Sequence, residues 1–226
     1  MTLGVNDKSA KTRILVVDDH PLVRNGLVKL LSQESDLVCC GEASTVAEAQ
    51  RGAANLHPNL ILLDLRLRSG DGLELIKSLT GQFPKSLILV LSQHDERHYV
   101  ERALRAGARG YLLKDQAAHE VLNAIRSVLA GEIYLSPALM ACMLRKLATD
   151  RDNAAVRLDQ LSDRELHVLQ LLGGGMSTRQ IALDLHLSFK TIETHRENLK
   201  RKLGLRNASE LVHYAINLFG SEPVSA

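Results

Sequence analysis

Several polar side chains that can take part in chemistry come directly after short apolar runs in the first half of the chain. Runs of this kind, separated by helix-length segments, predict buried parallel strands, whose carboxyl ends meet at one edge of the sheet. We therefore expect three carboxylates, a hydroxyl and an ammonium to gather in one crevice. The groups are Asp18 and Asp19 after 14–17, Asp64 after 59–63, Ser92 after 87–91 and Lys114 after 110–113.

The predicted crevice has the chemistry of a magnesium-assisted phosphoryl acceptor. Mg²⁺ takes oxygen ligands and needs only one or two direct carboxylates. A dication beside Asp64 would neutralise an incoming phosphoryl group and align it for attack by the carboxylate. Lys114 would offer a positive charge to the phosphoryl oxygens, and Ser92 a hydroxyl donor. The alternative is that each residue merely caps a strand or a helix, but the complete set at the right strand ends favours the site.

The elements that would position these groups indicate an α/β first domain over residues 12–131. Its five predicted strands alternate with helical segments and lack a strong hairpin signal, so they form a doubly wound, flavodoxin-like sheet of five parallel strands with right-handed crossovers. The strand pattern stops after Gly131. The predicted strands are 13–18, 37–42, 59–64, 87–92 and 109–113.

A linker over 132–157 and an all-α second domain over 158–219 follow. The first part of the linker has a helical apolar patch, and Thr149 to Ala155 looks like a hinge. Ser162, Ser177 and Ser188 each have the position of a helix N-cap, and a fourth helix is expected over 208–219. The second and third helices are expected to form a helix-turn-helix around His186 and Leu187. The glycine run 173–175 lacks the Lys and Ser/Thr of a phosphate loop and ends the first of these helices.

The third helix of the second domain is the candidate for the major groove of DNA. Ile192, Leu199 and Leu203 fall on one face, and six of the 28 basic residues lie between Lys190 and Arg206. An amphipathic surface helix is the alternative. His195 lies nearer the apolar face, which favours a packed histidine. The predicted base-edge and phosphate contacts are Lys190, Thr191, Glu193, Thr194, Arg196, Asn198, Lys200, Arg201 and Lys202.

The first domain resembles the receiver domain of two-component response regulators. This resemblance implies that Asp64 is the phospho-acceptor, that Asp19 and Asp64 bind Mg²⁺ directly, that Asp18 assists through water and that the backbone carbonyl of Arg66 completes the protein ligands. It also implies a switch pair, Ser92 and Tyr111, although Tyr111 as an ordinary strand aromatic stays open. The motifs are Val16-Val17-Asp18-Asp19-His20, Leu62-Leu63-Asp64-Leu65, Leu91-Ser92 and Gly110-Tyr111-Leu112-Leu113-Lys114.

Three positions depart from the common receiver pattern. Arg68 stands where many receivers have Pro, and Gln93 where many have a small residue, so we expect Gln93 to alter the lifetime of the acyl phosphate. Asp115 replaces the Pro that often follows the lysine, which argues against a cis peptide bond there.

The second domain resembles the LuxR-type domain of NarL/FixJ response regulators, on Leu161 to Glu165, Ile181-Ala182, Ser188 to His195 and Lys202-Leu203-Gly204. The resemblance implies a transcription regulator that binds double-stranded DNA as a homodimer. Phosphate from a histidine kinase would free the recognition helix, and RNA polymerase is a further candidate partner. Leu211, Ala215, Leu218 and Phe219 form either the dimer seam or part of a monomer core.

Composition narrows the function classes. The chain has no uncharged apolar run of membrane-spanning length and no signal-peptide core, so we expect a cytoplasmic protein without membrane contact. Cys39, Cys40 and Cys142 have neither a zinc spacing nor an even count for disulfides. A magnesium-dependent phosphatase would carry a second acid two positions after its nucleophile, where this chain has Arg66, so we expect no turnover enzyme. A receiver that no longer takes phosphate is the remaining alternative.

Overall fold

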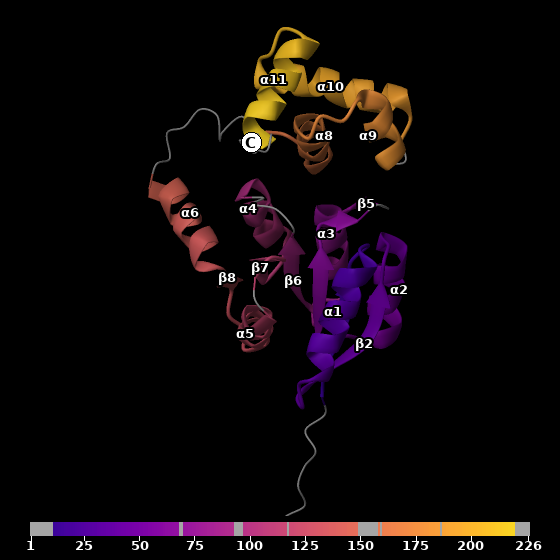
Figure 1. Cartoon of the computed structure of the whole chain (residues 1–226), viewed down its shortest axis with the longest axis vertical. Coiled ribbons are helices and arrows are strands. Elements are labelled where there is room, and N and C mark those ends of the chain that lie inside the picture. Colours follow the sequence, from indigo (N-terminus) through magenta and orange to yellow (C-terminus); the bar gives the residue numbers. More distant parts are fainter. Residues whose placement is uncertain are drawn as a thin grey trace, which may run out of the picture. The chain divides into compact units, whose positions relative to one another are not determined.

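The structure is a computed structural model, and it describes residues 11–67, 70–92, 97–116, 118–148, 158, 160–185 and 187–219. Contacts divide the chain into two compact units, Met1–Arg145 and Lys146–Ala226. Figure 1 colours the first unit from indigo to salmon and the second from orange to yellow.

The first unit is built on a parallel sheet of six strands. All five strands predicted from the apolar runs are present, and non-consecutive neighbours in the sheet mean that the chain crosses over between them. Strands β1, β3, β6 and β7 are neighbours, so their carboxyl ends lie at one edge. In spatial order the strands are β2 (Leu37–Ala43), β1 (Thr12–Val17), β3 (Leu60–Asp64), β6 (Leu87–Ser92), β7 (Gly110–Leu113) and β8 (Tyr134–Leu135).

Helices cover both faces of this sheet, which is why its central strands β3 and β6 are nearly continuous apolar runs and do not alternate. On one face, Ile14 and Val16 of β1 join a buried cluster with side chains of α1 (Pro21–Ser32) and α5 (Ala118–Leu129). On the other face, Leu15 lies against Gly52 of α2. The helices that cover this other face are α2 (Val46–Leu56), α3 (Gly72–Gln82) and α4 (Arg97–Ala106).

Two short elements go beyond the sequence prediction. Strand β8 adds a sixth strand after Gly131, where the strand pattern was expected to stop, and its Tyr134 N–H donates to the carbonyl of Arg109 at 3.0 Å. The Tyr134 hydroxyl also donates to Glu120 of α5 at 2.7 Å. A two-residue strand has no periodicity that a sequence can reveal. The same holds for the antiparallel pair β4 (Arg66–Leu67) and β5 (Gly70–Asp71).

The segment predicted as a linker contains a helix, α6 (Pro137–Ala148). Its Leu139 side chain is buried, whereas Met140 and Leu144 are exposed. The predicted hinge over 149–155 lies outside the described residues.

Over 160–219, the described residues of the second unit form α8 (Asp163–Gly173), α9 (Thr178–Asp184), α10 (Phe189–Leu203) and α11 (Ala208–Phe219). Ser162, Ser177 and Ser188 are the N-caps of the first three, as predicted, and each side chain accepts a backbone N–H three residues on. Gly173 lies where α8 meets α11, and a Cβ there would come within 2.5 Å of the Ala215 carbonyl oxygen. The glycine therefore allows the two helices to pack closely.

Candidate functional site

The acidic side chains of the first unit converge at the carboxyl ends of β1 and β3. Asp18 and Asp19 follow β1, and Asp64 is the last residue of the neighbouring β3. One ligand atom from each of Asp18, Asp19, His20 and Asp64 lies within 4.8 Å of the others. This edge is where the strand order reverses on either side of β1, the point at which open α/β sheets bind ligands.

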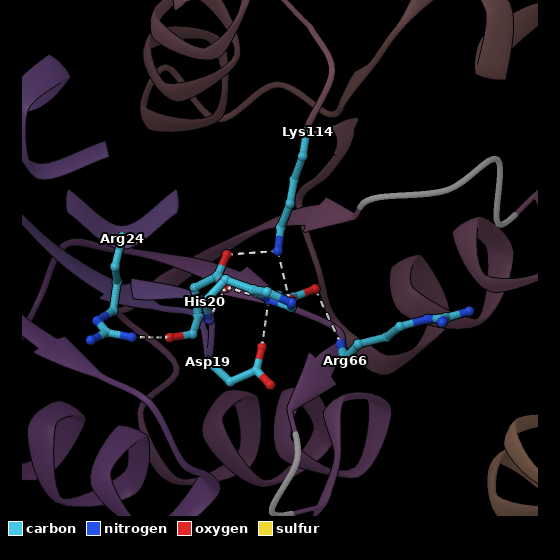
Figure 2. A network of polar contacts seen from close by, with 7 residues as sticks. Asp19, His20, Arg24, Arg66 and Lys114 are labelled. Atoms are coloured by element: carbon cyan, nitrogen blue, oxygen red, sulfur yellow. Dashed lines mark hydrogen bonds and ion pairs between the residues drawn. The ribbon is translucent and has the colours of Figure 1, made fainter. Parts of the chain in front are cut away.

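Lys114 reaches into this cluster from the end of β7. Its Nζ lies 2.6 Å from Asp18 Oδ2 and 2.7 Å from Asp64 Oδ2, and its side chain is 7% exposed. Figure 2 shows the ammonium group between the two carboxylates. The backbone N–H of Lys114 donates to the carbonyl of Ser92 at 2.6 Å, which ties the ends of β6 and β7 together.

In the described part of the chain, this pocket brings together three carboxylates and one lysine ammonium group. Asp18 and Asp64 are buried beside Asp19, and Lys114 contacts Asp18 and Asp64. Burial raises the pKa of Asp64 to about 6, Lys114 counteracts that rise, and the nearby charge of Asp18 adds to it. The carboxylates therefore gain from an additional cation.

The oxygen donors of the pocket fit Mg²⁺. Asp18 has protein partners at both oxygens, since the His20 N–H donates to Oδ1 at 2.8 Å and Lys114 Nζ lies beside Oδ2. Asp64 Oδ1 accepts the Arg66 N–H at 3.1 Å, which orients this carboxylate. Mg²⁺ needs only one or two direct carboxylates and keeps several waters, so these three acids could hold it partly by direct contact and partly through water.

The predicted switch residues lie at the neighbouring strand ends. Ser92 is fully buried as the last residue of β6 and pairs with Leu113 of β7. Tyr111, on the same β7, is also fully buried, so its ring lies inside the first unit. Two departures from the receiver pattern, Arg68 and Gln93, lie outside the described residues. In the described part of the chain no peptide bond is cis, including the one before Asp115.

Two residues that sequence reasoning left without a role contact the acidic loop. The Arg24 guanidinium donates to the backbone carbonyl of Asp18 at 2.7 Å and to Glu42 of β2 at 3.2 Å. His20 Nδ1 lies 2.8 Å from Asp19 Oδ1. Arg24 lies one helical turn after His20, and its backbone N–H donates to the His20 carbonyl. That spacing is the signal that places Arg24 next to the acids.

In the second unit, α10 has the two faces that its sequence predicts. Ile192, Leu199 and Leu203 are buried in the core. Among the predicted DNA contacts away from this core, Lys190, Thr194 and Arg201 are exposed, and Thr191, Glu193 and Asn198 are partly buried.

Several basic residues of α10 have partners inside the unit. Arg196 hydrogen-bonds Thr178 of α9, and Lys202 pairs with the buried Glu165 of α8 at 2.6 Å. Lys200 pairs with Glu197 on its own helix at 2.8 Å. Arg196 and Lys202 therefore fasten α10 to its neighbours. Their predicted contacts with DNA phosphates would have to be made in addition to these bonds.

The remaining predictions for the second unit concern burial. Burial lowers the pKa of His195 and the charge of Arg164 adds to this, an environment that favours the packed histidine over the DNA contact. Leu211 and Ala215 are fully buried in the monomer, whereas Leu218 and Phe219 are only partly buried. The first two are therefore core residues, so a dimer seam on α11 would have to use other side chains.

In the described ranges no helix combines the length and the apolar character needed to span a bilayer.

Comparison with known proteins gives the same division of the chain. Residues 14–126 match the response regulator receiver domain family, and residues 159–215 match the luxR family of bacterial regulatory proteins. Over 209 residues the chain is 34% identical to the oxygen regulatory protein NreC of Staphylococcus aureus strains bovine RF122 / ET3-1 and MRSA252, covering 90% of this chain and 96% of that protein.

Solved structures with similar folds include the RcsB response regulator of Salmonella typhimurium, with a TM-score of 0.68 and 26% identity over 92% of this chain and 98% of that one. A second is RcsB of Salmonella enterica serovar Typhimurium bound to the promoter P1flhDC in the presence of the phosphomimetic BeF3⁻. Its TM-score is 0.66, with 26% identity over 92% of this chain and 99% of that one.

Proposed function

Because this chain belongs to the response regulators that join a receiver domain to a LuxR-family DNA-binding domain, it regulates transcription under the control of phosphorylation, and we propose that Asp64 is the residue that accepts the phosphoryl group. The observation that carries the proposal is the buried, negatively charged pocket in which Lys114 joins Asp18 and Asp64. We assign 12–131 to the receiver, 132–157 to the linker and 158–219 to the DNA-binding domain.

In the proposed reaction a carboxylate oxygen of Asp64 attacks the phosphorus of a phosphohistidine on the partner kinase. A P–O bond forms, the P–N bond breaks, and its electron pair stays on the imidazole nitrogen of the donor. Mg²⁺, when bound at Asp19 and Asp64, supplies charge neutralisation for the phosphoryl oxygens. Lys114 is placed to leave Asp64 for a phosphoryl oxygen, and the Arg66 N–H orients the attacking carboxylate. Ser92, at the next strand end, is the hydroxyl donor of the proposed switch.

The pocket supports an acceptor rather than a phosphatase with turnover. The residue two positions after Asp64 is Arg66, and its backbone N–H, not an acid, contacts the Asp64 carboxylate. Without a general acid at that place, the acyl phosphate would persist long enough to act as a signal. A receiver that has lost its chemistry is disfavoured because the acids and Lys114 remain in contact.

Phosphorylation would act on the second unit through dimerisation. We propose that it frees the exposed face of α10, with Lys190, Thr194 and Arg201, for the major groove of double-stranded DNA. DNA as the target makes the cytoplasm the expected location. RNA polymerase would be a partner at the promoter.

Labelling with acetyl phosphate and Mg²⁺ tests the acceptor. We expect a mass increase of one phosphoryl group, located at Asp64 by peptide mapping and removed by hydroxylamine, as expected for an acyl phosphate. Asp115→Asn is the matched control because Asp115 is an exposed acid one residue after Lys114. Labelling of a peptide without Asp64 would reject the assignment.

Selection of bound DNA from a random pool, with and without acetyl phosphate, tests the gate. The selected site then serves to compare the affinity of BeF3⁻-treated protein with that of Asp64→Ala. We expect tighter binding and a dimeric complex only for the treated wild type. Equal affinity of the two proteins would show that phosphorylation does not gate DNA binding.

A further inference from the structure

We propose that His20 supplies a nitrogen ligand to the divalent cation in the acidic pocket, so that the pocket prefers cations that bind imidazole, such as Mn²⁺, over Mg²⁺. The inference rests on the proposed function, because it places the cation beside Asp19 and Asp64.

The position of the imidazole carries the argument. His20 Nδ1 lies 2.8 Å from Asp19 Oδ1 and 3.3 Å from Asp18 Oδ1. The ligand atoms of His20 and the three acids lie within 4.8 Å of one another. Two ligands on opposite sides of a divalent cation are about 4.0–4.6 Å apart, from bond lengths of about 2.0–2.3 Å. The donor set therefore has nearly the span that a single ion requires.

The His20 Nδ1 atom has the burial and the lack of a hydrogen bond that are expected of a metal ligand. The side chain is 41% exposed, but this nitrogen is buried, and it forms no hydrogen bond with the described part of the protein. Its approach to Asp19 Oδ1 has the distance of a hydrogen bond without the angle. Figure 2 shows the ring directed toward the Asp19 carboxylate.

The backbone holds the ring in this place. The His20 N–H donates to Asp18 Oδ1 at 2.8 Å, and the His20 carbonyl accepts from Arg24 in the first turn of α1. His20 is the N-cap residue of α1, yet its side chain makes no capping hydrogen bond. Asn is a favourable N-cap residue, so His20→Asn should keep the helix start while it removes the imidazole.

Cation chemistry then predicts a selective effect. As a transition-metal ion, Mn²⁺ accepts an imidazole ligand more readily than Mg²⁺, which prefers oxygen ligands and retained water. We expect His20→Asn to weaken Mn²⁺ binding roughly tenfold and Mg²⁺ binding less than about twofold. His119→Asn, which removes a histidine that is 72% exposed on α5, should change neither affinity.

Pulsed electron paramagnetic resonance of Mn²⁺ bound to the tag-free full chain tests the ligand directly. We expect a ¹⁴N coupling of a bound imidazole that changes to the ¹⁵N pattern when the protein is made with ¹⁵N-histidine. His20→Asn should lose the coupling, and His119→Asn should keep it. The labelled wild type gives the answer even if His20→Asn does not fold.

The outcomes separate this inference from the proposed function. Suppose that Mn²⁺ binds at Asp19 and Asp64, as judged by the loss of binding in Asp19→Asn, but shows no nitrogen coupling. This result would overturn the role of His20 and leave the phosphoryl acceptor intact. No binding of Mn²⁺ or Mg²⁺ would overturn both. Nitrogen coupling that persists in His20→Asn would assign the ligand to another residue and reject the inference.

Discussion

Each unit of this protein holds a lysine against a buried carboxylate. In the receiver, Lys114 Nζ lies 2.7 Å from Asp64 Oδ2, and in the DNA-binding unit, Lys202 Nζ lies 2.6 Å from Glu165 Oε2. The contacts have nearly the same length, but the pKa values of the two acids shift in opposite directions. The pKa of Asp64 is raised to about 6, with burial as the main cause. Burial also acts to raise the pKa of Glu165, but Lys202 and Ser162 outweigh it and the net shift is downward.

The difference lies in what else each carboxylate contacts. Glu165 faces one cation and also accepts the Ser162 N–H at 2.8 Å in the capping box, so its charge is satisfied within the unit. Lys114 is shared between Asp18 and Asp64, and Asp19 lies beside them. A balanced buried pair fastens helices, whereas an unbalanced cluster is prepared for a ligand. The same residue types thus join helices in one unit and, under the proposed function, take part in chemistry in the other.

Removing one carboxylate from each unit should separate these roles most strongly. We expect Asp64→Asn to reduce phosphoryl incorporation from acetyl phosphate to below about a thousandth of wild type, because the nucleophile is gone. Glu165→Gln should incorporate phosphate normally, since Gln keeps the capping position of α8. Intact-mass spectrometry after a fixed labelling time measures both. Normal labelling of Asp64→Asn would contradict the assignment.

Removing the lysines should affect stability unequally. Lys114→Met leaves two buried carboxylates facing each other, and we expect the free energy of unfolding of the receiver to fall by about 3 kcal/mol at pH 7.5 without divalent cations. The loss should shrink when Mg²⁺ is added. Lys202→Met should cost about 1 kcal/mol, because Lys202 is 30% exposed and Glu165 keeps its hydrogen bond from Ser162.

Urea unfolding followed by NMR measures each unit through its own amide signals, with Leu62 reporting on the receiver and Ile192 on the DNA-binding unit. If the two lysine variants lost equal free energies of unfolding, the charges of the receiver pocket would be as well balanced as those of the capping box. That result would contradict the proposed difference between the two sites.

The opposite pKa shifts predict opposite dependences on pH. Between about pH 4 and 6, the folded receiver keeps a proton on Asp64 that the unfolded chain has released, so its stability falls as pH rises. The total is up to about 3 kcal/mol, at about 1.4 kcal/mol for each pKa unit. The stabilisation from Glu165, whose folded pKa is below 4.5, is present above that value and is lost as pH falls through the folded pKa.

The same urea experiment in EDTA, repeated from pH 4 to 7, checks the two signs. The difference in the free energy of unfolding between wild type and Asp64→Asn isolates the contribution of Asp64, and the difference between wild type and Glu165→Gln isolates that of Glu165. If both contributions changed with pH in the same direction, the assignment of the pKa shifts would be contradicted.

The sequence predicts the elements of both units because each depends on local patterns. The apolar runs and the serine caps locate the five longer strands and the four C-terminal helices, and parallel strands then bring Asp18, Asp64 and Lys114 to one edge. The additional strand β8 is missed because two residues, Tyr134 and Leu135, carry no periodicity.

What the sequence does not predict are contacts that depend on how elements pack. The Lys202 to Glu165 pair joins residues 37 positions apart and requires the crossing of α10 and α8. The approach of His20 to Asp19 depends on the side-chain direction at the start of α1, and motif spacing alone does not determine that direction. Sequence reasoning therefore treated Lys202 only as a DNA contact, without its structural partner.

The smallest effect should come from the exposed face of α10, where a side chain acts on DNA alone. Arg201 is exposed, and its hydrogen bond to Asn198 at 3.1 Å stays within the helix surface. We expect Arg201→Ala to change the free energy of unfolding by less than about 0.5 kcal/mol.

If Arg201 contacts a phosphate, the variant weakens DNA binding uniformly across sequences and lowers the slope of log affinity against log salt by about 1. If it contacts a base edge, the loss is confined to one position of the site, at about 1–3 kcal/mol. Fluorescence anisotropy with the selected site, its single-base variants and several salt concentrations distinguishes the two. Lys29→Ala, which removes a cation from α1 of the receiver, is the control, and an equal change of slope for both variants would mean that overall charge, not the face of α10, determines the affinity.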